Sequence, residues 1–189
     1  MISRRAVLRL SAAVLAGLSA AGAFGVPAVD AAEALRPVPA VLPPLPAGPV
    51  MLTVDTPTGP RGFTLAEVEA VGLRALTLDL VWTGEGGVYH GVLLPDLLAA
   101  TGLQDAPAVE VHAIDGYHAT IPRHDWQTWP ILLATRRDGQ PMAVRDKGPM
   151  RILYAMTPEQ VLASDKMDVR WVWMVDRITV AAQGAGDPS

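Results

Sequence analysis

The 189-residue sequence predicts an α+β fold in which mixed sheets are joined by short helices. Short segments rich in aliphatic and β-branched residues recur along the chain, a pattern that is typical of strands. Between them lie short stretches that carry helix-capping and helix-stopping residues. The sequence has no internal repeat, so we expect one domain with enough residues to bury its own core.

The first half of this domain is expected to alternate strands with helices. Thr64 can cap the amide near Glu67, and Gly72 can end the helix that begins there. A second helix presents an apolar face of leucines and stops at Gly102. The expected elements are a strand at 50–56, a helix at 64–72, a strand at 73–82 and a helix at 91–102.

The second half begins with a predicted hairpin around the Asp115-Gly116 turn. Val109 and Val111 alternate with Glu110 and His112, which predicts one buried and one solvent-facing side of the first strand. Later elements include a helix with a Thr cap and a proline at its first position. The expected elements are strands at 108–114 and 117–122, a helical turn at 123–129, strands at 131–136 and 150–156, a helix at 157–164 and the last strands within 170–182.

The N-terminus has the composition of an export signal. A basic start precedes an apolar segment from about Leu10 to Val26, and the motifs Val29-x-Ala31 and Ala32-x-Ala34 are both suitable for cleavage. The segment Ser3–Leu8, SRRAVL, is similar to a twin-arginine leader, and an ordinary Sec signal with paired arginines is the alternative. We therefore assign residues 1–31 to a signal peptide and expect the protein in the periplasm.

Composition divides the rest of the chain into three parts. Leu35–Pro49 contains six prolines among its fifteen residues, which indicates an extended tether over 32–49. The domain is expected at 50–182, and residues 183–189 are expected to form a disordered tail.

Charge and cysteine content exclude several classes of function. Cleavage after Ala31 would remove three arginines and one aspartate and leave 12 basic and 18 acidic residues, a net charge of −6. Such an acidic chain is a poor candidate for nucleic-acid binding. The sequence has no cysteine, so it has no disulfide framework, no thiol nucleophile and no thiolate metal ligand.

Charged and aromatic residues gather at predicted strand ends, where binding groups commonly lie. Trp171 and Trp173 alternate around Val172, so a strand would place both indoles on one face, although core packing is an alternative role. The candidate ligand-binding residues are Trp82, Thr83, Asp115, Tyr117, Arg145, Lys147, Trp171 and Trp173.

The polar candidates each have a simpler interpretation. Asp115 can serve as a turn residue, or its carboxylate can accept two parallel N–H groups from a planar heterocycle. Arg145 and Lys147 can form a solvated charged turn with Asp146, or they can bind a carbonyl or phosphate.

Other chemistry finds little support in the sequence. The four histidines, His90, His112, His118 and His124, lack the spacing of metal ligands, so we expect no metal site. Neither a serine nucleophile elbow nor a Walker motif is present. The Gly84–Gly87 segment, GEGG, is expected to be a flexible loop that can act as a lid.

Several motifs in order resemble the sulfite-oxidase-type molybdopterin-binding domain over about Val50–Val180. The most specific are GVLLPDLL from Gly91, DGY from Asp115 and GPMR from Gly148. The resemblance implies a mixed α+β fold with a pterin cleft. The enzymes of that family hold molybdenum through a cysteine at about the position of Leu78. The leucine at that position argues against their oxo-transfer chemistry, because the metal needs a soft thiolate ligand.

The segments YHATIP, RDKGP and RWVWMVDRI are more closely similar to small periplasmic pterin-responsive regulators. This resemblance implies a non-catalytic sensor that binds a reduced pterin, without molybdenum. Its implied partner is the periplasmic sensor domain of a membrane diguanylate cyclase/phosphodiesterase. The alternatives are a molybdopterin-binding oxidoreductase or accessory domain of a redox complex, and a pterin-free module that binds proteins.

Overall fold

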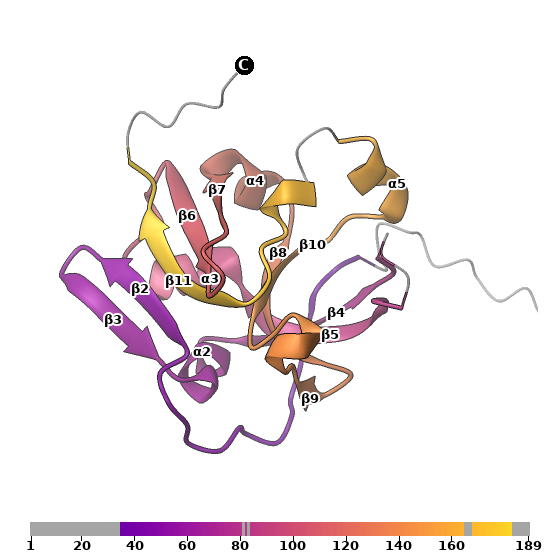
Figure 1. The fold of residues 1–189 in the computed structure, drawn as a ribbon, viewed down its shortest axis with the longest axis horizontal. Helices are drawn as coiled ribbons and strands as arrows, with labels where there is room; N and C mark the ends of the chain where they lie inside the picture. Colours follow the sequence, from indigo (N-terminus) through magenta and orange to yellow (C-terminus); the bar gives the residue numbers. More distant parts are fainter. Residues whose placement is uncertain (1–34, 81, 83, 165–167, 183–189) are drawn as a thin grey trace, which may run out of the picture.

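The computed structural model describes residues 35–80, 82, 84–164 and 168–182. The expected signal peptide, the expected tail at 183–189 and Thr83 lie outside these residues. Two sheets with short helices around them make up the domain (Figure 1), which confirms the predicted α+β fold. Among the described residues, no helix has the length and apolar character that crossing a bilayer requires.

The first sheet has five strands in one path and a sixth strand at its side. All of its neighbouring strands are antiparallel. The order is β1 (Val38–Pro39), β4 (Leu73–Leu78), β5 (Gly87–Leu93), β8 (Ile131–Arg137) and β10 (Arg151–Tyr154), with β9 (Gln140–Pro141) paired to β8.

The second sheet has five strands, and its β11–β2 pair is parallel. The other pairs are antiparallel. The order is β3 (Gly59–Phe63), β2 (Leu52–Thr56), β11 (Val175–Val180), β6 (Ala108–Ala113) and β7 (His118–Pro122). The burial of β6 alternates as predicted, with Val109, Val111 and Ala113 inward and Glu110 and His112 more exposed.

Within the described ranges, four short α-helices and two 3-10 turns connect these strands. The predicted caps are confirmed, because Thr64 and Thr157 each form a reciprocal capping box with the side chain three residues later. The elements are α2 (Leu65–Ala70), α3 (Leu94–Ala100), α4 (Arg123–Thr128), α5 (Pro158–Leu162), η1 (Val144–Asp146) and η2 (Asp168–Arg170).

Three expected boundaries were wrong. The helix expected at 91–102 begins only at Leu94, because Gly91–Leu93 belong to β5, a strand that the sequence analysis missed. The strand expected at 73–82 ends at Leu78. In the C-terminal segment the strand starts at Val175, and Trp171–Trp173 lie outside any strand.

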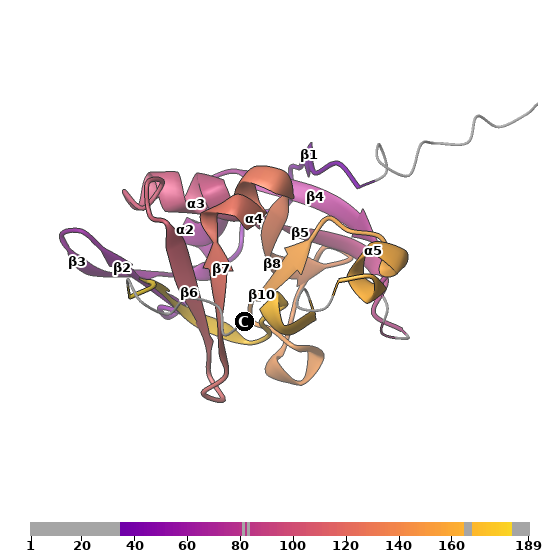
Figure 2. The same cartoon turned by 90° about the horizontal axis from the view of Figure 1, so that it is seen from above.

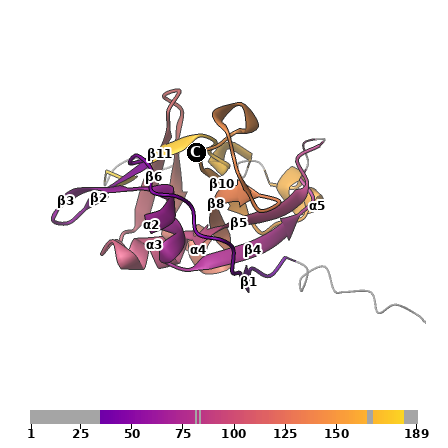
Figure 3. The same cartoon turned by 90° about the horizontal axis from the view of Figure 1, so that it is seen from below.

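The start of the domain also lies earlier than residue 50. β1 pairs with Ala75 and Arg74 of β4 inside the segment assigned to the tether (Figure 3). Further along, the buried Arg136 donates to the carbonyl of Pro43 at 2.9 Å and to the carboxylate of Glu69 at 2.6 and 2.8 Å. Part of the proline-rich segment thus contacts the domain, at Val38–Pro39 and at Pro43.

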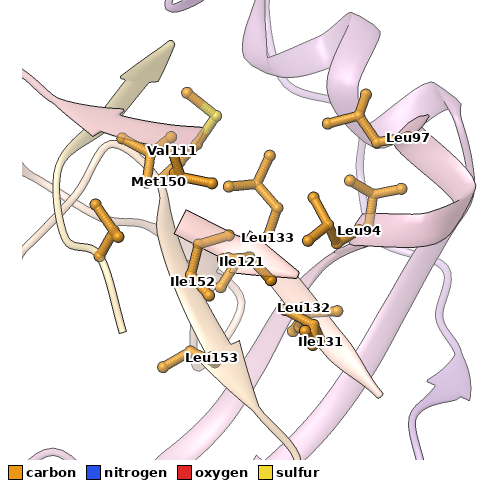
Figure 4. Packing of buried hydrophobic residues seen from close by; sticks show 14 of the residues in the cluster. Leu94, Leu97, Val111, Ile121, Ile131, Leu132, Leu133, Met150, Ile152 and Leu153 are labelled. Atoms are coloured by element: carbon orange, nitrogen blue, oxygen red, sulfur yellow. The ribbon is translucent and has the colours of Figure 1, made fainter. Parts of the chain in front are cut away.

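The core lies between the two sheets and under α3. Val111 and Ile121 come from the second sheet, Leu133 and Ile152 from the first, and Leu94 from α3, and all five are fully buried (Figure 4). Burying side chains of this size stabilises the fold by about 1.5–3 kcal/mol each. The helices α3 and α4 lie at one end of the second sheet, whereas the β6–β7 hairpin turn projects at the other (Figure 2).

Gly91 allows β5 and β8 to approach closely. A Cβ atom at this position would lie 2.1 Å from the carbonyl oxygen of Leu133 and 2.6 Å from the Cα of Ala134, both in the backbone of the neighbouring strand. We expect Gly91→Ala to lower the free energy of unfolding by about 2–4 kcal/mol, because the strands must separate. Chemical denaturation measures this loss.

Gly48→Ala is the matched control, since the nearest atom to its added methyl group would be the Pro46 carbonyl oxygen at 3.9 Å. It should change stability by less than about 0.5 kcal/mol. Equal stability of the two variants would contradict the close approach at Gly91.

Candidate functional site: an aromatic pocket beside a buried ion-pair cluster

A cavity of about 310 Å³ lies between the β6–β7 turn and the segment that leads into β11. This volume falls at the lower end of the roughly 300–1,000 Å³ typical of small-molecule sites. The structure brings five of the predicted site residues together in its lining. The lining residues are Trp82, Asp115, Tyr117, Val169, Trp171, Trp173 and Met174.

Three indoles form the aromatic part of the pocket. The ring of Trp82 meets Trp171 and Trp173 edge-on, with centroid distances of 5.5 and 5.8 Å. Among the described residues, the indole N–H groups of Trp171 and Trp173 are buried and have no hydrogen-bond partner. Because these nitrogens have almost no accessible surface, a ligand in the cavity would meet the faces and edges of the rings and not the N–H groups.

Backbone hydrogen bonds hold the tryptophan-bearing segment between the two sheets. Val172 accepts from Ile152 N–H of β10 at 2.8 Å, and Met174 N–H donates to the carbonyl of Lys147 at 3.1 Å. The carbonyl of Met174 accepts from Ile114 N–H at 3.1 Å, just after β6. The segment is thus fixed on both sides although it is not a strand and Met174 has a left-handed backbone (φ 53°), and Trp171 and Trp173 line the same cavity.

A second layer of side chains positions Trp171. The ring of Tyr154 stacks on it with an interplanar angle of 14°. The Tyr154 hydroxyl donates to the buried carboxylate of Asp125 at 2.9 Å, and Arg170 donates to the same oxygen at 2.9 Å. Burial, with the Asp125 carboxylate as a further cause, raises the pKa of Tyr154 well above its ordinary value. The Tyr154 hydroxyl therefore stays protonated and keeps its hydrogen bond to Asp125, and the stacked ring holds Trp171 in place.

A cluster of three charged side chains borders the aromatic pocket. Glu85 pairs with Lys147 and accepts from both terminal nitrogens of Arg151 at 3.1 Å. Lys147 Nζ lies 3.6 Å from the centroid of the Trp173 ring and 5.4 Å from that of Trp82. Arg151 is only 2% exposed, and its Nε has no partner in the part of the chain that the structure describes. The cluster places two cations and one anion beside the indoles.

The sequence analysis missed both Glu85 and Arg151. Arg151 follows the GP pair of the GPMR motif and opens β10, so the signal was present in the quoted motif. Glu85 lies in the GEGG segment, which was expected to be a flexible lid. Instead, Arg137 donates to the carbonyls of Gly84 and Gly86 at 2.7 and 2.6 Å.

Tyr89 completes the anchoring of this segment. Its hydroxyl donates to the Glu85 carbonyl at 2.6 Å, and burial raises its pKa despite the nearby Arg151 and Arg137. The phenol therefore stays protonated and keeps donating to the segment that carries Glu85.

The structure does not bring Arg145 to the pocket. Its side chain is 85% exposed and lies 3.6 Å from the carboxylate of Asp146, which matches the simpler interpretation of a solvated charged turn. The short η1 turn and the left-handed backbone of Lys147 (φ 66°) send the two neighbouring cations in different directions. Lys147 is thus the cation of this turn that reaches the tryptophans.

Asp115 lines the cavity and also acts as a turn residue. Its carboxylate accepts from the Tyr117 backbone N–H at 3.0 Å, which stabilises the hairpin turn. Asp115 is exposed at the pocket. The Tyr117 hydroxyl donates to the carbonyl of Val169, so Tyr117 closes one side of the lining.

Comparison with known proteins agrees with this architecture. A family model described as the oxidoreductase molybdopterin binding domain matches residues 69–185, more than half of the chain. The chain belongs to this family. A search of curated proteins gives no match.

A solved structure shows the same fold. The sulfane dehydrogenase SoxCD from Paracoccus pantotrophus aligns with a TM-score of 0.51 and 16% sequence identity over 68% of this chain. The alignment covers 37% of the SoxCD chain, so this protein spans little more than a third of that relative. At this identity the likeness concerns the fold, and it confirms the sulfite-oxidase-like α+β architecture.

The residues at the pocket fit a pterin better than a thiolate-bound metal. The aromatic lining and the two cations suit the flat ring, the carbonyl and any phosphate of a pterin ligand. At about Leu78, where the resemblance implies a cysteine in the family's enzymes, the leucine side chain is buried at the end of β4, and Leu80 is buried nearby in the sequence. Aliphatic side chains offer no ligand to a metal.

The Glu85 carboxylate is expected to stabilise the buried Arg151. We expect Glu85→Gln to lower the free energy of unfolding by about 2–3 kcal/mol, since it leaves a nearly inaccessible guanidinium without its counter-charge. Asp146→Asn, which alters the exposed pair with Arg145, should cost less than about 1 kcal/mol. Thermal and urea unfolding of both variants measures the difference, and a Glu85→Gln protein as stable as the Asp146→Asn protein would refute this role.

Proposed function

We propose that this protein binds a pterin in the tryptophan pocket and does not use a protein thiolate to hold molybdenum there. The observation that carries the proposal is a cavity lined by three tryptophans and Asp115, with Lys147 Nζ 3.6 Å from the centroid of the Trp173 ring. A pterin is flat, rich in nitrogen and oxygen acceptors, and often attached to a phosphate. Each of these properties has a matching group at the site.

The indoles supply apolar walls for the ring. Aromatic contacts of this kind contribute about 0.5–1.5 kcal/mol each beyond area burial. Asp115 supplies an acceptor for the adjacent N–H groups of the aminopyrimidinone edge. Lys147 and Arg151 supply donors for the ring carbonyl or for a phosphate, provided that the ligand replaces part of the contact with Glu85.

We further propose a non-catalytic role in signalling. The export-type leader and the resemblance to pterin-responsive regulators support a periplasmic protein that reports a reduced pterin to the periplasmic domain of a membrane cyclic-di-GMP enzyme. A sensor of this kind needs different loaded and empty states. Glu85 is the group best positioned to differ between them, because it competes with the ligand for both cations.

A second candidate function follows from family membership. An oxidoreductase molybdopterin binding domain without a cysteine can serve as an accessory domain that holds molybdopterin within a redox complex. Both roles use the same pocket, and they differ in whether molybdenum is bound together with the pterin. Mass spectra and fluorescence of small molecules released from the purified chain distinguish them.

A released pterin without molybdenum supports the sensor, and pterin together with molybdenum supports the accessory domain. If nothing is released, titration with 6-hydroxymethylpterin and its dihydro form tests the pocket directly. No saturable binding of either compound would overturn the proposal.

Two cations of one turn provide a matched test of the site. Lys147→Met should weaken binding of the pterin about tenfold, equivalent to ~1.4 kcal/mol, because it removes the charge beside Trp173. Arg145→Met should leave the affinity unchanged, since its side chain points to solvent. Tryptophan-fluorescence titration of both variants measures the effect. Equal affinities would show that the ligand does not contact this cluster.

A further inference from the structure

We propose a second site, for a divalent transition-metal ion such as Zn²⁺ or Cu²⁺, on the solvent-facing side of the β6–β7 hairpin. Its ligands would be Glu110, His112 and His118. The sequence analysis expected no metal site because the histidine spacing matched no linear motif. In the folded chain, however, the hairpin register places His112 directly opposite His118, and Glu110 two residues before His112 on the same side.

The three side chains already converge on one point. The Nε2 atoms of His112 and His118 lie 3.2 and 3.9 Å from the same oxygen of Glu110. One ligand atom from each residue fits within 4.8 Å of the others. An ion bonded at about 2.0–2.2 Å to two ligands holds them at most about 4.4 Å apart, so small side-chain rotations complete the set.

The donor set determines which ions suit the site. Two imidazoles and one carboxylate favour Zn²⁺, Cu²⁺ and Ni²⁺ over Mg²⁺ or Ca²⁺, which prefer oxygen ligands alone. Three protein ligands leave at least one coordination position for water or a partner's side chain. His118, with 59% of its side chain exposed, gives solvent access to the ion.

The surroundings favour a cation and hold the ligands in place. His112 lies between β7 and β11, and its Nε2 is 3.4 Å from the Thr179 hydroxyl of β11. Arg177, the β11 neighbour of His112, directs its guanidinium to Asp55 at 2.6 and 2.9 Å. That pairing neutralises the nearest positive charge on the strand. The buried faces of Val109, Val111 and Ala113 anchor β6 beneath the ligands.

An ion at this position would tie the two strands three residues from the turn that carries Asp115. It would therefore stabilise the hairpin whose tip lines the tryptophan pocket. The metal site does not depend on the proposed pterin binding, because its three ligands lie outside the pocket lining.

Isothermal titration of the untagged chain with ZnCl₂, and separately with CuCl₂, tests the proposal. We expect one ion per chain, and at least tenfold weaker binding for His118→Gln and for Glu110→Gln. His124→Gln is the matched control, since His124 is an exposed histidine on α4 whose ring contacts Thr128. It should bind the ion as tightly as the unmodified chain.

Thermal unfolding gives a second measurement of metal binding that does not depend on the heat of binding of each variant. Zn²⁺ should raise the melting temperature of the unmodified chain and of His124→Gln, and should not raise that of His118→Gln. Since His118 is exposed, its substitution is expected to leave the fold intact, which circular dichroism can verify. Lack of saturable binding, or equal affinity of the His118→Gln and His124→Gln proteins, would overturn the metal site.

Discussion

The pocket depends on a short backbone segment that passes from one sheet to the other. Residues 172–175 are hydrogen-bonded to Lys147, Met150 and Ile152 at the edge of the first sheet, then continue into β11 of the second. The bond from Ile114 N–H to Met174 adds the β6–β7 hairpin to the same segment. Because these contacts fix the backbone on both sides, the two indoles and the turn at Asp115 keep their relative positions without a ligand. The pocket is therefore preorganised by main-chain bonds, which lowers the entropic cost of binding.

In the ion-pair cluster, by contrast, the charged side chains are already paired with one another without a ligand. Arg151 is buried, and a buried charge without a partner is costly. Glu85 removes that cost in the described structure. An anionic ligand would therefore have to offer Lys147 and Arg151 at least what Glu85 offers. This competition would couple occupancy of the pocket to the position of the 84–87 segment.

Much of the fold could be predicted from local sequence patterns, and the site only in part. The Thr64 and Thr157 caps depend on residues three positions apart, so the sequence contains the whole interaction. Trp171 and Trp173 were placed on one side by alternation, which holds for any extended segment. The prediction that Arg145 lies at the pocket was wrong, because the direction of a side chain in a 3-10 turn depends on backbone angles that the residue types did not reveal. The pairing of His112 with His118, by contrast, depends on the length of the turn, since a two-residue Asp115-Gly116 turn would place His112 opposite Ala119, whereas the observed turn is centred on Asp115.

The absence of cysteine separates two properties that the family's enzymes combine. Binding of the pterin requires a flat apolar slot with polar donors and acceptors around it, and Trp82, Trp173 and Lys147 meet that need. Oxo-transfer of the family's type further requires a soft thiolate, which the resemblance places at about Leu78, and that buried aliphatic side chain cannot supply one. The wall made by Trp173 does not depend on that position, because the 172–175 segment is held by its bonds to Lys147, Met150 and Ile152. A ligand that needs only the aromatic walls and the charge of Lys147 can therefore bind whether or not a protein thiolate is present.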